Sequence, residues 1–376
     1  MTLDMSNTDK LSEFRSEAQR LGIKVEAPSV NRSSATFEVN EGVICYALAA
    51  LKGVGAHAVE LIAEARKNGF FTSLADFAAK VPPRAINKRV IESLAAAGAF
   101  DALEPNRARV FAGAEAILAA CQRSHEATML GQNDMFGGMA DAPDIMLPRA
   151  EPWLPADRLR REYEAVGFFL SGHPLDDYAT ALKRLRVQSW VEFSRAVKAG
   201  ATAGKVAATV LSRTERRTKT GNKMGIIGLS DPTGHFEAVL FSEGLALFRD
   251  VLEPGAAVLL QLDAELQGED VRARVSRAEP LDDAAAKTQK GLRIFLRDSK
   301  PLESIERRLL ANQNGDLAGV AGVPASRQAG EGDVSLVMLL DLETEVEIKL
   351  PGRFRVSPQI AGAIKAVSGV VDVRAI

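Results

Sequence analysis

Five short segments in the second half of the chain constrain its fold more than any other feature. They cover residues 204–212, 224–230, 235–241, 256–267 and 270–280. In each, apolar and polar residues alternate, and this period of two predicts a half-buried strand. One helical segment, 242–255, stands between the third and the fourth. Five strands with a helix at that place predict a closed β-barrel of the OB type.

The first half of the chain has the period of helices instead. A helix is predicted over 8–22, before a stretch of extended chain and turns. Beyond it, short helical segments are interrupted by glycine, most clearly at 48–69 and 86–101. A further helix is predicted over 107–130. Together these segments predict a helical domain over 41–130.

The composition changes again after this helical part. Residues 131–156 are rich in Gly, Pro, Asp and Met and have no sustained period, which predicts a linker. A helical connector is predicted over 157–200, and the barrel over 201–285. From 286 to 376 the order strand, helix, two strands, helix, strand predicts a small α+β domain. The fold class is therefore multi-domain, with α and β parts.

A glycine-containing turn in the helical part is the first candidate binding site. It consists of Lys52, Gly53, Val54 and Gly55, and the next helix is predicted to begin near Ala56. Glycine permits positive φ and close approach of a backbone, while the first N–H groups of a helix lack partners. Such a helix-hairpin-helix turn can hold phosphate oxygens without reading base sequence. A plain interhelical turn with a glycine cap fits the same residues.

A second candidate site lies in the linker. It is the segment Gln132, Asn133, Asp134, Met135 and Phe136, with glycine on both sides. Two large apolar side chains in a polar segment have no evident core of their own, so they are interpreted as anchors for the pocket of a partner. Packing of the same two side chains back onto neighbouring helices is the alternative.

A third candidate site is a basic loop between the first two barrel strands. Its cations are Arg213, Arg216, Arg217, Lys219 and Lys223. On an OB fold this loop borders the face that binds single strands. Phe236 and Phe241 follow on one strand, and alternation places them on opposite faces, so at most one can stack on a base. A solvated hairpin tip is the alternative interpretation of the loop.

Other features of the sequence restrict the classes of function. The formal net charge of the 376 residues is only −2, so affinity for nucleic acid must come from local patches. Cys45 and Cys121 lack partners at metal-ligand spacing, which favours a reducing compartment. His173, in a Gly-His-Pro triplet, is interpreted as a packing or capping residue. No nucleotide, hydrolase or metal-site motif, secretory signal or membrane span is found, which predicts a cytoplasmic protein.

Five segments together resemble one known family. They are residues 8–23, the turn at 51–55, the segment 132–136, and the stretches REYEAVGFFLSGHPLD at 161–176 and TKTGNKMGIIGLSDPTGHFEAVLF at 218–241. In this order they are similar to the C-terminal part of the alpha subunit of bacterial DNA polymerase III. The last two stretches are the most specific, and the resemblance covers nearly the whole chain.

The resemblance implies a role for each part. Residues 1–40 would end a truncated fingers domain, and the domain over 41–130 would grip duplex DNA through Lys52 to Gly55. The segment Gln132 to Phe136, within 131–156, would dock into the sliding clamp, the beta subunit. The barrel would bind single-stranded template, and residues 286–376 would contact the tau subunit of the clamp loader.

The resemblance also implies where the chemistry of the family lies. Its histidinol-phosphatase-like and palm domains, with the catalytic aspartates, precede the matching part. We therefore expect no catalytic residue, cofactor or metal in this chain, and Mg²⁺ only in the absent catalytic domain. A nuclease, an independently active polymerase, a paralogue for error-prone synthesis and an unrelated OB-fold module are the alternatives.

Overall fold

The computed structural model describes residues 1–129, 145–217, 223–311, 331–340 and 344–376. These residues form two compact units, Met1–Gly172 and His173–Ile376. The predicted helical connector 157–200 is divided between them, because its first helix belongs to the first unit.

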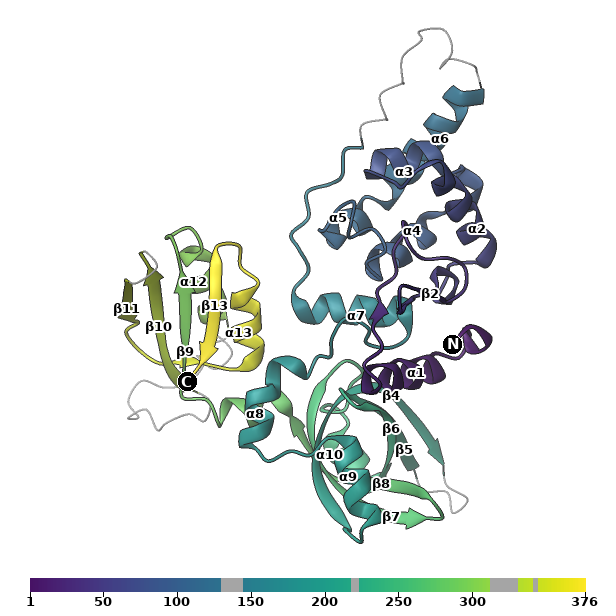
Figure 1. Cartoon of the computed structure of the whole chain (residues 1–376). Coiled ribbons are helices and arrows are strands. Elements are labelled where there is room, and N and C mark those ends of the chain that lie inside the picture. Colours follow the sequence, from purple (N-terminus) through teal and green to yellow (C-terminus); the bar gives the residue numbers. More distant parts are fainter. Residues whose placement is uncertain (130–144, 218–222, 312–330, 341–343) are drawn as a thin grey trace. The chain divides into compact units, whose positions relative to one another are not determined.

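The first unit is helical apart from one small sheet (Figure 1). Its α-helices are α1 (Thr8–Arg20), α2 (Ala56–Ala65), α3 (Leu74–Lys80), α4 (Lys88–Ala96), α5 (Arg107–Ala112), α6 (Ala114–Met129) and α7 (Pro155–Val166). Short 3-10 turns are η1 (Thr2–Asp4), η2 (Leu48–Ala50), η3 (Arg66–Asn68) and η4 (Pro83–Ala85). Strands β1 (Val25–Glu26), β2 (Glu38–Asn40) and β3 (Val43–Cys45) form the sheet in the order β1-β3-β2.

Side-chain caps begin several of these helices where the sequence changes from turn to helix. Asn7, Ser73, Asn87 and Asn106 each accept a hydrogen bond from a backbone N–H in the first turn. Such caps satisfy donors that a helix start leaves without partners. The helix predicted over 107–130 is instead two helices.

Gly113 stands between α5 and α6, and the later chain packs against it. A Cβ atom at this position would lie 2.5 Å from Cδ2 of Leu147. Leu147 and its neighbour Ile145 are partly buried against the core of the unit. The chain after the undescribed residues 130–144 is thus held on the helical unit by apolar contacts.

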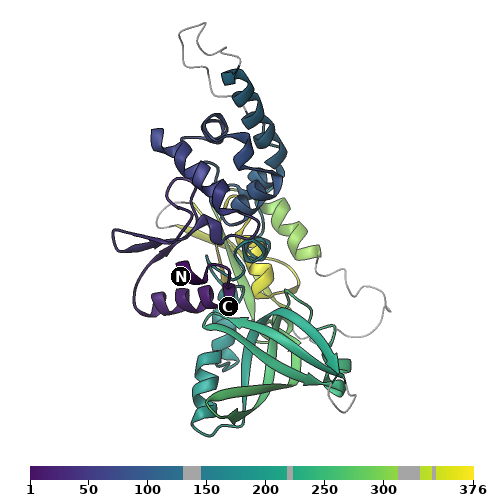
Figure 2. The same ribbon diagram turned by 90° about the vertical axis from the view of Figure 1, so that its right-hand side faces the viewer.

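The second unit contains a closed five-stranded barrel, which confirms the predicted OB fold. Its strands are β4 (Ala203–Arg217), β5 (Lys223–Asp231), β6 (Gly234–Phe241), β7 (Ala257–Gln267) and β8 (Asp270–Pro280), and α10 (Ser242–Phe248) lies between the third and fourth. The strands close in the order β4-β5-β6-β8-β7, with β6 and β8 parallel (Figure 2). Alternate residues such as Val206, Ala208 and Val210 fill its interior.

Three short helical elements precede the barrel in this unit. They are η5 (Asp176–Tyr178), α8 (Ala179–Arg184) and α9 (Trp190–Lys198). The last lies within the helical connector predicted over 157–200. Ser189 caps it, and the side chains of Ser189 and Glu192 each bond the backbone N–H of the other. Trp190 then stacks on Phe236, with ring centroids 4.1 Å apart.

The C-terminal residues form the predicted α+β domain. Its strands are β9 (Gly291–Leu296), β10 (Glu331–Leu339), β11 (Glu345–Lys349), β12 (Phe354–Arg355) and β13 (Val370–Ala375), and its helices are α12 (Leu302–Ala311) and α13 (Pro358–Lys365). Helix α11 (Leu281–Ala286) precedes it and packs in a separate core with η5, α8 and the barrel. The sheet order is β11-β10-β9-β13, with β12 beside β10. Leu292, Ile294 and Leu296 alternate along β9 and share a core with α12 and α13.

Candidate functional site

The predicted glycine turn lies on the surface of the first unit. Gly53 has a φ of +82°, which favours glycine, and the N–H of Val54 closes the turn on the carbonyl of Leu51 at 3.1 Å. Val54 is buried, whereas Lys52, Gly53 and Gly55 are exposed. One apolar side chain therefore anchors the turn and leaves its backbone open to a ligand. The segment before it is the 3-10 turn η2 and not the predicted helix.

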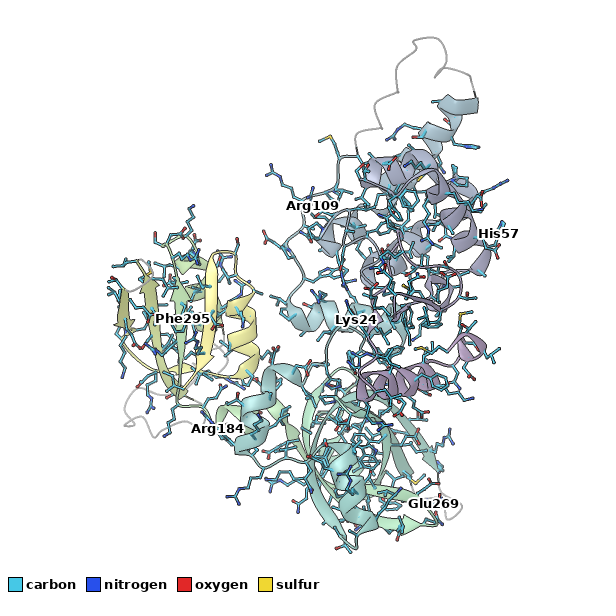
Figure 3. All side chains as sticks on the ribbon, viewed as in Figure 1. Lys24, His57, Arg109, Arg184, Glu269 and Phe295 are labelled. Atoms are coloured by element: carbon cyan, nitrogen blue, oxygen red, sulfur yellow. The ribbon has the colours of Figure 1, made fainter. Side chains whose placement is uncertain are left out.

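The turn leads directly into the start of α2. Gly55 is its N-cap, in an extended conformation, and no side chain caps the helix. The N–H groups of Gly55, Ala56 and His57 donate no hydrogen bond to any acceptor in the described part of the chain. The side chain of His57 is on the outside of the unit (Figure 3). Donors of this kind at a helix start favour an anion.

Lys52 is fixed by two other helices. Its N–H donates to the carbonyl of Ala165 on α7 at 2.8 Å, and its own carbonyl accepts from Ser93 Oγ on α4 at 2.6 Å. Its Nζ lies 5.7 Å from the ring centroid of Tyr163, and burial raises the pKa of that phenol. The neutral ring can therefore orient the ammonium group by a cation–π contact.

The sequence interpretation missed the residues that brace Lys52. Ala165 and Tyr163 lie far along the chain, beyond the linker, and no local pattern connects them to the turn. It also missed Arg89, whose exposed side chain lies across Gly53. Arg89 could have been found, because the Asn-Lys-Arg sequence before an apolar helix predicts a cap followed by two cations.

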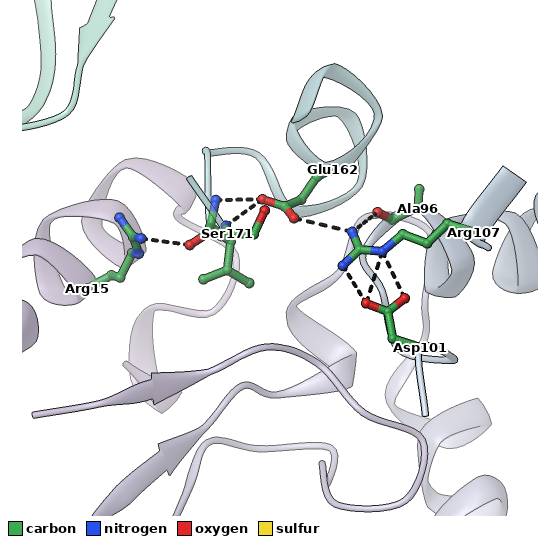
Figure 4. A network of polar contacts seen from close by, with 7 residues as sticks. Arg15, Ala96, Asp101, Arg107, Glu162 and Ser171 are labelled. Atoms are coloured by element: carbon green, nitrogen blue, oxygen red, sulfur yellow. Dashed lines mark hydrogen bonds and ion pairs between the residues drawn. The ribbon is translucent and has the colours of Figure 1, made fainter. Parts of the chain in front are cut away.

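A second glycine turn in this unit is closed to ligands. Gly98, with a φ of +84°, is covered by Arg107, and the residues around it are buried. Arg107 binds Asp101 at 2.7 Å, Glu162 at 3.4 Å and the carbonyl of Ala96 at 3.2 Å (Figure 4). This turn is used for packing, so the first turn is the one that presents free donors.

In the basic loop of the barrel, the predicted cations have different surroundings. Arg213 is mostly buried, donates to the carbonyls of Arg249 and Leu252, and pairs with Glu253 at 3.0 Å. It holds the segment after α10 against β4. The exposed cations of the loop are Arg216, Arg217 and Lys223. Lys219 lies outside the described residues.

Among the described residues, the exposed ring of Phe241 shares the outer face of the barrel with Arg216, whereas Arg217 and Lys223 lie on the other face of the same two strands. Arg216 is opposite Met224, and Met224 is opposite Phe241, so the three side chains share a face. Phe241 is 47% exposed, whereas Phe236 is 7% exposed and lies in the barrel core. As alternation predicted, only one of the two rings is available to stack on a base.

His173 has a packing role in the second unit. Its Nδ1 accepts from the N–H of Leu175 at 3.1 Å, and its Nε2 lies 3.2 Å from Ser230 Oγ. Asp231, which follows Ser230, accepts hydrogen bonds from the N–H of Trp190 at 2.6 Å and from the N–H of Thr233 at 2.8 Å. Burial raises the pKa of this aspartate. These contacts connect the start of α9 to the β5–β6 turn.

Three remaining predictions concern partners and metals. The segment Gln132 to Phe136 lies outside the described residues. Among the described residues, no group of three or more metal-ligating side chains comes together. No helix in the described ranges is long and apolar enough to cross a membrane.

Comparison with known proteins finds a family model that matches the helical part and relatives that match most of the chain. The family model described as "Helix-hairpin-helix motif" matches residues 22–110. DNA polymerase III subunit alpha from Caulobacter vibrioides (strain NA1000 / CB15N) is 40% identical over 372 residues, covering 98% of this chain and 31% of that protein. The same subunit from Bacillus subtilis (strain 168) is 32% identical over 323 residues, covering 84% of this chain and 28% of that protein.

The chain spans less than a third of the length of these relatives. Among solved structures, the SSB domain of a Synechococcus sp. protein matches 21% of this chain and 94% of its own length, at 14% identity and a TM-score of 0.20. The OB fold itself follows from the strand order of the barrel. Along nearly its whole length the chain matches a C-terminal part of DNA polymerase III subunit alpha, which confirms the family resemblance inferred from the sequence.

Proposed function

We propose that this chain holds DNA for a replicative polymerase while the polymerase reaction takes place in another segment. The turn at Lys52 to Gly55 binds the backbone of duplex DNA, and the outer face of the barrel binds single-stranded DNA. The observation that carries the proposal is the exposed turn, which contains Lys52 and leads into the free N–H groups of Gly55, Ala56 and His57.

Duplex binding through this turn follows from its chemistry. Backbone N–H groups and an ammonium group complement phosphate oxygens, which carry no base identity. Val54 and the contacts of Lys52 hold the turn in place before a ligand arrives, so little ordering is needed on binding. Because the net charge of the chain is −2, this binding depends on the local site.

Single-strand binding is proposed for the outer barrel face. Phe241 offers a ring for base stacking, and Arg216 on the same face offers positive charge to the phosphates. Arg217 and Lys223, on the other face of the same strands, add positive charge nearby. Stacking accepts every base because each base has a π-face. The face therefore suits a template strand of arbitrary sequence.

The partner contacts belong to the same proposal. Met135 and Phe136 remain the proposed anchors for the sliding clamp, supported by their position in a polar, glycine-flanked segment. The α+β domain is the proposed contact for tau. Mg²⁺ is assigned to the catalytic part of the polymerase, and the complex is placed in the cytoplasm.

A substitution at Gly55 tests the duplex site. Its φ is −80°, and a Cβ atom there would meet nothing within 4 Å, so Gly55→Glu fits the folded turn. Its carboxylate would stand where we place a phosphate. We expect duplex affinity, measured by fluorescence anisotropy at low salt, to fall about tenfold or more through charge repulsion at the contact.

The control for this test adds the same charge elsewhere. Gln122→Glu changes an exposed residue of α6, in the same unit. We expect it to bind duplex like the unchanged chain, because a single exposed charge away from the contact is screened by salt. Equal duplex affinities for the two variants would contradict the proposed site.

A further inference from the structure

Arg89 and Gly53 are packed against each other. Arg89 is the second residue of α4, and its stem runs across the turn. A Cβ atom on Gly53 would lie 3.0 Å from Nε of Arg89 and 3.5 Å from its Cδ and Cγ. The glycine therefore provides room for an arginine, in addition to allowing the positive φ of the turn.

The position of Arg89 relative to the turn is set by its helix. Asn87 caps α4 by accepting from the N–H of Val90 at 3.0 Å. Ser93, one helical turn after Arg89, donates to the carbonyl of Lys52 at 2.6 Å. One face of α4 is thus bonded to the turn, and Arg89 projects from that same face.

The two glycine turns of the unit show why the charge of Arg89 is available. At Gly98 the covering arginine is Arg107, which is 7% exposed and paired with both Asp101 and Glu162. At Gly53 the covering arginine is exposed, and no carboxylate in the described part of the chain pairs with it. The charge of Arg107 is thus paired with carboxylates and serves packing, whereas the charge of Arg89 has no such partner among the described residues.

Nearby charges strengthen this contrast. Lys88, next to Arg89, is paired with Glu115 at 2.6 Å, and that contact raises the pKa of the lysine. Lys52 lies on the turn itself, and its ammonium group faces a neutral ring. Arg89 lies against the turn and Lys52 lies on it, and this turn leads into the free N–H groups at the start of α2.

We propose that Arg89 is a phosphate-binding residue of this site, carried to the DNA backbone across Gly53. The proposal rests on the duplex binding proposed above and adds a ligand from a second helix. A guanidinium group binds phosphate oxygens by two parallel hydrogen bonds, which a lysine cannot do. The ligand contacted is the sugar-phosphate backbone, so base sequence has no influence.

Salt-dependent duplex binding of the full chain tests this role. Arg89→Met keeps a stem over Gly53 and removes the charge. We expect about tenfold weaker binding at low salt, and a decrease of about 0.9 in the slope of log K against log salt, because one phosphate contact is lost. Arg89→Lys should retain the slope with an intermediate affinity, since it keeps the charge without the paired hydrogen bonds.

The matched control is Arg123→Met. Arg123 is exposed on α6, and it lies eight residues beyond Glu115, roughly 12 Å along the helix axis. It loses the same charge and should leave affinity and slope unchanged. If the unchanged chain does not bind duplex, the proposed function and this role both fail. If Gly55→Glu weakens binding while Arg89→Met behaves like Arg123→Met, the role of Arg89 alone is rejected.

Discussion

Two phenylalanines on strand β6 have opposite environments because five positions separate them. Phe236 points into the barrel and stacks on Trp190 with ring planes only 4° apart. Phe241 faces outward beside Met224 and Arg216. At the scale of single residues, strand parity thus divides a structural ring from one that can contact a ligand.

Removing the exposed ring should weaken single-strand binding selectively. Phe241→Ala loses one stacking platform, worth about 1–3 kcal/mol for each stacked base. Titration of labelled oligonucleotides with the purified chain measures the loss. Leu266→Ala is the control, because Leu266 is 49% exposed on β7 and offers no ring. Equal affinities for the two variants would exclude Phe241 from the binding face, and duplex affinity should not change in either.

Not every residue of the basic loop could be assigned from the sequence. Strand alternation predicted which phenylalanine is exposed, because it needs only the positions along one strand. In the sequence, Arg213 and Arg216 are equivalent cations of one loop. In the structure, Arg213 donates to the carbonyls of Arg249 and Leu252, which come from a segment far along the chain. A charge pattern alone cannot show such a partner.

Among the elements of the first unit, helix α7 braces the proposed duplex site. It supplies the carbonyl of Ala165 and the ring of Tyr163 to Lys52. Its own position depends on Glu162, which is 1% exposed, accepts from the N–H groups of Leu170 and Ser171, and pairs with Arg107. A buried carboxylate therefore connects the brace to the rest of the unit (Figure 4).

Glu162→Ala should destabilise the first unit. It leaves buried N–H groups without an acceptor and removes one partner of Arg107, at a cost of about 3–5 kcal/mol. Urea unfolding of the chain, followed by circular dichroism, measures the change. Glu17→Ala breaks an exposed pair with Arg20 and should leave the free energy of unfolding nearly unchanged. A similar small cost for both variants would show that the buried network contributes little.

The elements themselves were predictable to the extent that their signals were local. The barrel strands follow from alternation, and α1 ends near Gly22 as the sequence indicates. Helix α9 lies within the predicted helical connector, and its start could have been placed, because Ser189 and Glu192 form a recognisable capping box. The contact of Leu147 with Gly113 could not be predicted, since Leu147 comes from beyond the linker.

At the scale of the whole molecule, the two proposed DNA-binding sites are on units with separate hydrophobic cores. The duplex turn belongs to the first unit, Met1–Gly172, and the barrel face to the second, His173–Ile376. Ser171, just before the boundary, donates to Glu162 of the first unit. His173, just after it, contacts Ser230 of the second unit. Each unit also has hydrophobic core clusters of its own.

A chain divided between Gly172 and His173 should consequently yield two folded, DNA-binding pieces. We expect the first to bind duplex and the second to bind single strands, each with its own unfolding transition. A covalent link makes the second contact intramolecular, so the intact chain should bind a duplex with a single-stranded extension up to about 10²-fold more tightly than either piece. The equimolar mixture of the pieces is the control, because it has both sites without the link. If the mixture binds the duplex with a single-stranded extension as tightly as the intact chain does, the two sites do not bind one DNA molecule together.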